Sequence, residues 1–329
     1  MNHKLLMKSF SLILILLPLL TSCKRPVAPI SKSAFYLDTY VQITVYDNKD
    51  QTALDEAVNL CEMYDELLSI SNPESDIYQI NHAKGAWVPV NPKTYELLKY
   101  AYAYCEQTDG LIDITIYPAK ILWNFKQNTD QDTSIPDAQA IATALKSVDY
   151  HLIQFDDQTQ SIQLSDPAAG IDLGCIGKGF IADEITSTMK SAGVKSGMVD
   201  LGGNVAVIGN KPDNTSYTVG IRKPFDSSAS YLDTVSCSDK SVVTSGIYER
   251  YFMHDNKLYH HILDPKTGYP AETDLISVTI IAAKSVDADV LSTYLLMLGE
   301  QGAKTFLSKH ADYQVVLINQ ENKIIKVNF

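Results

Sequence analysis

Residues 245–270 have the sequence SGIYERYFMHDNKLYHHILDPKTGYP, which combines ionisable side chains with turn-forming residues. Apolar and polar residues alternate on both sides of Asp255-Asn256, so the stretch predicts a β-hairpin that reverses there. The hairpin leads through His260 and His261 into an Asp-Pro-Lys-Thr-Gly turn. A catalytic base needs a fixed orientation and polar neighbours, and we therefore expect chemistry at His261. The alternative is a histidine that only packs, and one of the two should be structural because adjacent strand residues face opposite ways.

The remaining sequence mixes strands and helices without a regular order. Alternation predicts a strand over 35–46, a hairpin over 152–164, and apolar strands that enter glycines at 171–174 and 199–203. Helices are expected over 54–68, from Pro92 with Asn91 as N-cap to before Gly110, from near Asp137, from Ala182 to near Gly193, and from Ser285 as N-cap to Gly299. A polar surface loop is expected over 127–134. Hairpins without a sustained βαβα rhythm favour the α+β class over a doubly wound sheet.

The start of the chain has the features of an export signal. Lys4 and Lys8 precede an uncharged apolar run over 10–20, which is too short to span a bilayer comfortably. The run ends in Leu-Thr-Ser-Cys at Cys23, which resembles the lipobox of bacterial lipoproteins, where the cysteine is diacylated and becomes the mature N-terminus. We expect an exported protein that is lipid-anchored to the extracytoplasmic face of the bacterial cell membrane. The alternative is ordinary signal-peptidase cleavage beside a chance cysteine.

This interpretation divides the chain into three parts. They are a signal peptide over 1–22, a tether over 23–33 and an α+β domain over 34–329. The length of the last part suits either one large domain or two interlocked halves. The formal net charge of −12 argues against nucleic acid as a partner, since a polyanion favours a basic surface. The cysteines after the signal (Cys61, Cys105, Cys175 and Cys237) form no Cys-x-x-Cys pair, so we expect buried free thiols, although export permits disulfides.

A glycine-rich turn is expected to precede the helix that contains Ala182. Residues 171–179 run from an apolar strand through Gly174, Gly177 and Gly179 into that helix. A helix N-terminus offers unpaired N–H groups to a phosphate, and Lys178 would add a full charge. The turn matches neither common nucleotide fingerprint, so packing alone is an equal alternative.

A possible metal pair lies near the start of the helix expected from Ser285. Asp289 and Thr293 are four residues apart, which places a carboxylate and a hydroxyl on one helix face. Such hard oxygen ligands suit Mg²⁺, whereas Asp287 lies off that face. The alternative is that both acids only complement the helix dipole.

Together these segments resemble the ApbE family, the FAD:protein FMN transferases. Four sequence motifs of that family occur in this chain, in the same order as in the family. They lie at Asp172 to Gly179, Thr244-Ser245-Gly246, His261 to Pro270, and Ala288-Asp289 to Thr293. The resemblance extends from Leu37 to Gly299, nearly the whole mature chain. It implies an α+β fold of largely antiparallel sheets with packed helices, in a single catalytic domain of interlocked halves.

The resemblance also implies an activity and roles for individual residues. The enzyme would use Mg²⁺ to transfer the FMN half of FAD to a threonine or serine hydroxyl of an acceptor flavoprotein with an FMN-binding domain, releasing AMP. His261 would act as the base, while Asp289, Thr293 and the backbone carbonyl of Cys175 would bind Mg²⁺. The FAD site would comprise Leu37, Ser71, Leu111, Ile112, Asp113, Asp172, Lys178 and Leu263.

Two other functions use the same sequence features. The chain departs from the family pattern at Leu37-Asp38-Thr39, at 109–113 and at Ser71, so its flavin contacts are expected to differ. A metal-dependent FAD pyrophosphatase would use the same site with water as the acceptor. A surface lipoprotein that binds flavin without turnover would need neither base nor metal.

Overall fold

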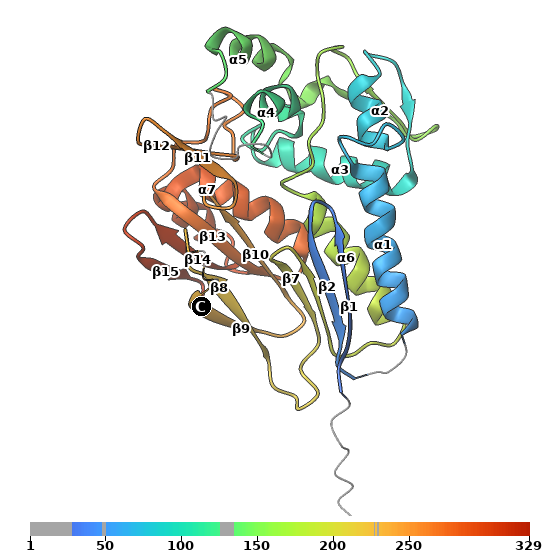
Figure 1. The fold of residues 1–329 in the computed structure, drawn as a ribbon, viewed down its shortest axis with the longest axis vertical. Helices are drawn as coiled ribbons and strands as arrows, with labels where there is room; N and C mark the ends of the chain where they lie inside the picture. The colour runs from blue at the N-terminus through green and yellow to red at the C-terminus, as the bar shows by residue number, and fades with distance from the viewer. Residues whose placement is uncertain (1–27, 48–50, 126–134, 227, 229) are drawn as a thin grey trace, which may run out of the picture.

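The computed structural model describes residues 28–47, 51–125, 135–226, 228 and 230–329. It confirms the α+β class, with a broad antiparallel sheet, helices packed against it and further helices beyond one end of the sheet (Figure 1). The strands are β1 (Ile30–Tyr36), β2 (Thr39–Val45), β3 (Val88–Pro89), β4 (Ile153–Asp156), β5 (Ser161–Leu164), β6 (Gly197–Leu201), β7 (Asn204–Ile208), β8 (Tyr217–Arg222), β9 (Tyr231–Cys237), β10 (Ser241–Gly246), β11 (Tyr251–His254), β12 (Lys257–His260), β13 (Leu275–Ala282), β14 (Gln314–Asn319) and β15 (Ile324–Val327). The helices are α1 (Thr52–Leu68), α2 (Asp76–His82), α3 (Pro92–Gln107), α4 (Tyr117–Trp123), α5 (Ala138–Ala144), α6 (Gly177–Ser191) and α7 (Ser285–Leu307), with short 3₁₀ turns η1 (Ile114–Ile116), η2 (Leu145–Ser147) and η3 (Tyr150–Leu152).

The main sheet has the strand order β1-β2-β6-β7-β10-β13-β14-β15, and every neighbouring pair is antiparallel. All residues of β7 and β13 are buried, so both faces of the sheet are covered at its centre. Branched aliphatic side chains dominate these two strands, and such side chains pack well on a pleated surface.

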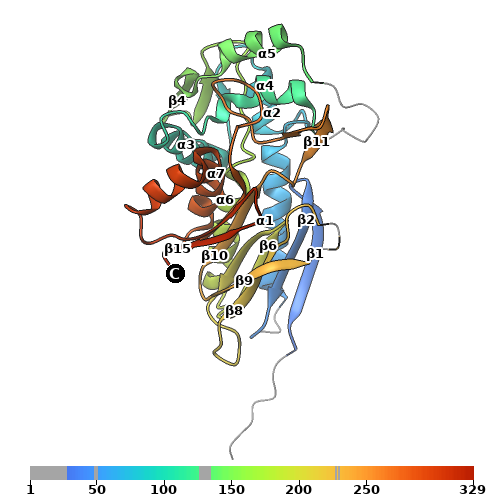
Figure 2. The same ribbon diagram turned by 90° about the vertical axis from the view of Figure 1, so that its left-hand side faces the viewer.

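Helices α1, α6 and α7 pack on the sheet and on one another, in the order α1-α6-α7 (Figure 2). Their buried side chains belong to the same core as the strands. The predicted end of the last helix is marked in the structure by Gly299, whose φ of 71° and ψ of 178° break the helical path before the chain continues to Leu307. Helices α2 to α5 and the small sheet β3-β5-β4 form the upper part of the molecule in Figure 1.

Several local predictions are confirmed. Asn91 caps α3 by accepting the amide of Lys93, and Asp137 caps α5 by accepting the amide of Ala140. The hairpins over 153–164 and 251–260 are present, and Asp255 is one of the two turn residues with positive φ in the second. Cys61, Cys105, Cys175 and Cys237 are free thiols; three are buried and Cys175 is partly exposed.

Three local predictions are wrong. The single strand expected over 35–46 is a hairpin of β1 and β2, in which Leu37 (φ 56°) and Asp38 (φ 57°) form the turn. A leucine rarely adopts positive φ, so the sequence carried no turn signal; the amide of Leu37 is held by the Asp65 carboxylate at 2.7 Å.

The segment 171–174 is extended but belongs to no sheet, and Ser285 is not an N-cap. Asn81 replaces a partner strand for Ile171, because its side-chain amide accepts from the Ile171 amide (2.6 Å) and donates to the Ile171 carbonyl (3.0 Å). Ser285 is the first helical residue of α7, and its hydroxyl donates to Asn204 instead of capping the helix.

The predicted signal peptide, Cys23, the first part of the tether and the loop over 127–134 lie outside the described residues. No helix within the described ranges is long and apolar enough to cross a bilayer.

Candidate active site

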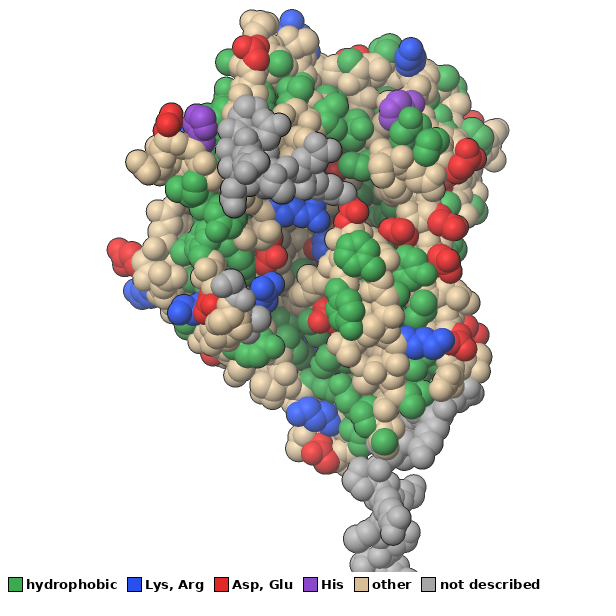
Figure 3. Space-filling model, in the orientation of Figure 1, with side chains coloured by type: hydrophobic (Ala, Val, Ile, Leu, Met, Phe, Trp, Pro, Cys, Tyr) green, Lys and Arg blue, Asp and Glu red, His purple; other side chains and the backbone are tan. Residues whose placement is uncertain are grey.

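A cavity of 830 Å³ opens at the end of the main sheet where the predicted motifs meet. Figure 3 shows the molecule hollowed near the centre of this face, with basic and acidic side chains around the opening. Every candidate site residue after Cys23 lines the cavity: His261, Leu37, Ser71, Leu111, Ile112, Asp113, Asp172, Lys178, Leu263, Cys175, Asp289 and Thr293. Segments that are far apart in the sequence are therefore brought to one place.

The cavity carries more acidic than basic side chains among the described residues. Seven carboxylates line it: Asp38, Asp65, Asp113, Asp172, Asp200, Glu249 and Asp289. Four cationic side chains line it: Lys120, Lys178, Arg222 and Arg250. An anionic ligand would meet net repulsion here unless a cation enters with it.

His261 is held so that one ring nitrogen is available as a base. Its backbone amide and its Nδ1 both contact the carbonyl of Arg250, at 3.0 and 3.2 Å. A carbonyl only accepts, so Nδ1 carries the proton and Nε2 is left as an acceptor. Burial first, and then the charges of Lys120 and Arg250, lower the pKa of His261 to about 3. The imidazole is therefore neutral near pH 7, the form that a general base requires.

His260 is the structural member of the pair. It is 4% exposed, and its Nε2 donates to the carbonyl of Ala271 at 3.1 Å. Burial lowers its pKa to about 4, so it also remains neutral near pH 7. The two histidines thus divide between packing and the cavity as the alternation of the strand predicts.

The turn after His261 is fixed by hydrogen bonds and by an aromatic cluster. The Asp264 carbonyl accepts the amide of Gly268 at 2.7 Å, and the Asp264 side chain accepts the amide of Lys266 at 2.8 Å. Trp123, which is buried, donates its indole N–H to the carbonyl of Gly268 at 2.7 Å. Its ring packs against Phe125, Phe252, Tyr259 and Tyr269. These contacts fix the path of the loop that carries His261.

The glycine turn between 172 and 177 leads directly into the N-terminus of α6. The amide of Asp172 donates to the carbonyl of Ile114 (2.8 Å), and the Asp172 carboxylate accepts the amide of Gly174 at 3.0 Å. Lys120 also donates to this carboxylate at 2.6 Å. Lys178 approaches the same turn, with its Nζ 3.5 Å from the carbonyl oxygen of Gly174.

Helices α6 and α7 are joined by two carboxylates that act in opposite directions. Asp183 of α6 accepts the amides of Ser285 and Val286 at 2.8 and 2.9 Å, and so caps α7. Asp289 of α7 accepts the amide of Gly179 at 2.8 Å. A β-carbon at Gly179 would lie 2.5 Å from the carbonyl oxygen of Ser285, so this contact requires glycine.

The arrangement of Asp289 fits a divalent cation. In a regular helix the Gly179 amide would bond the carbonyl of Cys175, but it bonds Asp289 and leaves that carbonyl without the helical bond. Asp289 is 4% exposed and lines the cavity, and no ion pair joins it to a described Lys, Arg or His. A buried carboxylate without a cation favours a metal ion beside it.

Thr293 lies one turn further along α7 and is held by Ser245 of β10. The Ser245 hydroxyl is 2.9 Å from the hydroxyl of Thr293 and 2.7 Å from that of Ser292. The described residues contain no cluster of three His, Cys, Asp or Glu side chains suited to a metal. A metal here would need one carboxylate, one hydroxyl, a backbone carbonyl and ligand phosphates, which is a set that Mg²⁺ accepts.

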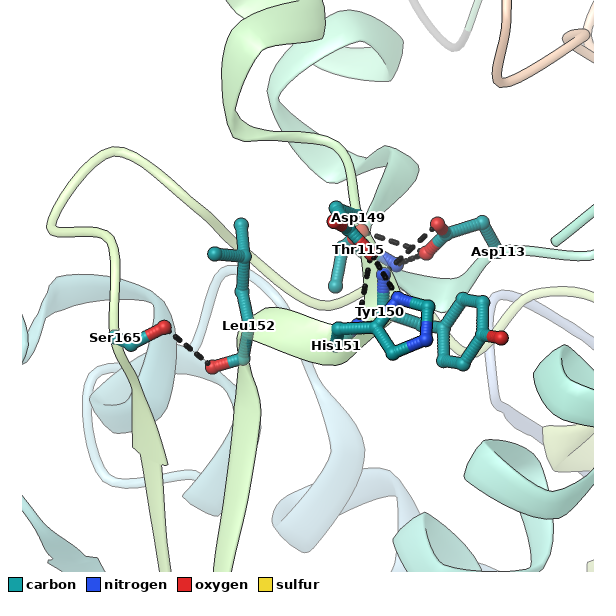
Figure 4. A network of polar contacts seen from close by, with 7 residues as sticks. All are labelled: Asp113, Thr115, Asp149, Tyr150, His151, Leu152 and Ser165. Carbon is teal, nitrogen blue, oxygen red and sulfur yellow. Dashed lines mark hydrogen bonds and ion pairs between the residues drawn. The ribbon is translucent and has the colours of Figure 1, made fainter.

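Asp113 supports the wall of the cavity. Its carboxylate accepts the amide and hydroxyl of Thr115 (2.8 and 2.6 Å) and the amide of Tyr150 (3.0 Å), as Figure 4 shows. Burial raises its pKa despite these bonds. Nearby in the same view, Asp149 accepts from the amide and ring of His151. Asp113 therefore ties η1 to η3 whether or not it also contacts a ligand.

Leu37 and Ser71 line another part of the cavity wall. Leu37 is in the β1–β2 turn, and its amide donates to Asp65 of α1. Ser71 follows α1, with its hydroxyl 3.2 Å from the hydroxyl of Ser69. Leu111 and Ile112 follow α3, and Leu263 follows His261 by two residues. The structure brings all five to the cavity.

Three cavity residues were not among the candidates predicted from the sequence. Lys120 is on α4, a helix that was not predicted, and Asp200 is on β6, where its carboxylate accepts the amide of Gly203 at 2.7 Å. Arg250 lines the cavity, and its backbone carbonyl orients His261. Each position depends on contacts between distant segments.

Comparisons with known proteins agree with this geometry. Residues 37–317 match the profile described as the ApbE family. A protein of Klebsiella pneumoniae (strain 342) named FAD:protein FMN transferase is 32% identical over 296 residues, covering 90% of each chain. One of Treponema pallidum (strain Nichols) with the same name is 31% identical over 312 residues, covering 89% of this chain and 85% of that protein. The crystal structure of the ApbE protein of Thermotoga maritima matches with a TM-score of 0.82 and 31% identity, over 91% of this chain and 97% of that one.

Proposed function

This chain belongs to the ApbE family of flavin transferases, and we propose that it uses Mg²⁺ to transfer FMN from FAD to a threonine or serine hydroxyl of an acceptor flavoprotein. The observation that carries the proposal is the single cavity that holds a neutral, oriented His261 together with the Asp289–Thr293 pair and the glycine turn. An inert binding protein has no need of an oriented base.

The proposed reaction assigns one step to His261. The acceptor hydroxyl oxygen would attack the phosphorus of the FMN half of FAD, and the bond from that phosphorus to the bridging oxygen would break. AMP would leave, and Nε2 of His261 would take the proton of the hydroxyl. The neutral tautomer fixed by the Arg250 carbonyl is the form that can accept this proton.

A metal ion at this site would supply the positive charge that the cavity lacks. Asp289, Thr293 and the carbonyl of Cys175 would hold Mg²⁺, which would neutralise pyrophosphate charge. Lys178 and the amides at the start of α6 would contact the remaining phosphate oxygens. The carboxylates around the cavity explain why the ligand would need a metal partner.

The test is to incubate the mature protein with FAD, Mg²⁺ and an FMN-binding acceptor domain, and to measure the intact mass of the acceptor. The proposal predicts an added FMN that disappears when EDTA removes the metal. Free FMN without an adduct would indicate a pyrophosphatase. Bound but intact FAD would indicate a flavin-binding lipoprotein, and either result would refute the transferase.

We also propose that the protein is exported and anchored through lipid on Cys23. The proposal is supported by the order of segments in the first 23 residues: lysines come first, an apolar run follows, and small residues precede Cys23. Metabolic labelling with a clickable palmitate should mark the wild type and not Cys23→Ser. Equal labelling of the two would refute the anchor.

A further inference from the structure

Lys120 brings an ammonium group to the glycine turn from α4, a helix outside all of the sequence motifs. Its Nζ is 2.6 Å from Oδ1 of Asp172. A β-carbon at Gly174 would lie 3.1 Å from the same Nζ. Lys178 reaches the turn too, at 3.5 Å from the Gly174 carbonyl. Two ammonium groups from different helices therefore flank one turn.

We propose that Lys120 is a second phosphate-binding residue, which shares the pyrophosphate of FAD with Lys178, and that Asp172 positions it. This inference rests on the function proposed above. An ammonium has three N–H donors, and Asp172 Oδ1 accepts one of them. No other described residue accepts a hydrogen bond from Lys120, so its other two donors can contact phosphate oxygens at the turn.

The surroundings of Lys120 favour a role in ligand binding over one in folding. The Lys120 side chain is 27% exposed and that of Asp172 is 11% exposed, and both line the cavity. Lys120 is one of four cationic side chains against seven carboxylates in the described cavity wall, so its loss would increase the repulsion of an anion.

Lys120 also lies within electrostatic reach of the base. Its charge, after burial and together with that of Arg250, lowers the pKa of His261. The same ammonium therefore acts at the turn and near His261.

The experiment compares Lys120→Met, Lys120→Arg and wild type in the full mature chain. Dissociation constants for FAD, ADP and riboflavin are measured by calorimetry in the presence of Mg²⁺. Loss of a charge-assisted hydrogen bond should weaken FAD and ADP binding by about 10- to 100-fold in Lys120→Met. Riboflavin, which has no phosphate, should bind as it does to the wild type. Lys120→Arg should restore most of the affinity for ADP.

Lys99→Met is the matched control, because Lys99 is exposed and pairs with Asp157 outside the cavity. It should leave all three dissociation constants unchanged. Wild-type ADP affinity in Lys120→Met would overturn the inference, and so would an equal loss for riboflavin, which would indicate a deformed cavity. If Lys120→Met does not fold, Lys120→Gln is measured against the same criteria.

The outcome is separable from that of the proposed function. A wild type that forms no FMN adduct would refute the transferase, while a phosphate-specific loss in Lys120→Met would still support this binding role. A wild type that forms the adduct, with unaltered ADP binding in Lys120→Met, would refute only the inference about Lys120.

Discussion

Replacing Gly179 with alanine should destabilise the protein and separate the two helices that form the proposed metal site. The added β-carbon would lie 2.5 Å from the carbonyl oxygen of Ser285, 2.7 Å from Cα of Val286 and 2.7 Å from Cβ of Asp289. Two of these three atoms belong to the backbone, so they cannot move aside by changing rotamer. The expected response is a shift of α6 away from α7.

The size of the effect follows from three contributions to the free energy of unfolding. Overpacking in a close contact costs about 1–3 kcal/mol. Lengthening the hydrogen bond from the Gly179 amide to the Asp289 carboxylate, 2.8 Å in the wild type, costs about 1.5–3 kcal/mol. The higher helix propensity of alanine returns about 1 kcal/mol. The net loss is about 1.5–5 kcal/mol, which corresponds to a fall in Tm of roughly 2–8 °C for a chain of this length.

Gly177→Ala is the matched control for a thermal unfolding experiment. It adds the same methyl group to the first turn of the same helix, but the nearest atom to its β-carbon is Cβ of Leu173 at 3.9 Å. Its Tm should equal or slightly exceed that of the wild type. If Gly179→Ala is as stable as Gly177→Ala, the close contact between α6 and α7 does not exist as described.

Two further predictions concern the metal and the histidines. Asp289→Asn keeps an oxygen for the Gly179 amide but loses the charge. The variant should therefore fold normally, require more Mg²⁺ for activity and recover partly in excess Mg²⁺. Asp287→Asn is the control, because the Asp287 carboxylate contacts Tyr104, and it should keep the wild-type metal dependence. Unaltered metal dependence in Asp289→Asn would support the helix-dipole alternative. Burial lowers the pKa of His261 in the folded state, so the unfolded chain binds the extra proton. The free energy of unfolding should therefore fall as the pH drops below about 6.5, by at most about 1.4 kcal/mol per pH unit. Denaturant unfolding at pH 7 and 5 should show a smaller loss in His261→Gln, and an equal loss would contradict the depressed pKa.

Features set by neighbouring residues were predictable from the sequence. The Asp255-Asn256 hairpin, the Asn91 and Asp137 caps and the helical glycine turn all depend on local backbone preferences. The co-occurrence of His261, Asp289 and the glycine turn predicted one site, because phosphate transfer can use a base, a metal ligand and a phosphate-binding turn together. The structure places these residues at one cavity, while their roles remain predictions.

Features set by distant contacts were not predictable. The cap of α7 comes from Asp183, 102 residues before Ser285, and the extended segment at Ile171 is held by Asn81, 90 residues away. Leu37 adopts positive φ where the Asp65 carboxylate holds its amide. In each case a side chain from another element supplies the hydrogen bond that local sequence would normally provide.

The most direct test of the central claim is the single-turnover rate of FMN adduct formation by His261→Ala, with FAD affinity measured on the same protein. The loss of a general base should reduce the rate about 10²- to 10⁴-fold. The dissociation constant for FAD should stay within a few-fold of the wild-type value, because the proposed pyrophosphate contacts lie at the glycine turn. Adduct formation at the wild-type rate would contradict the assignment of His261 as the base.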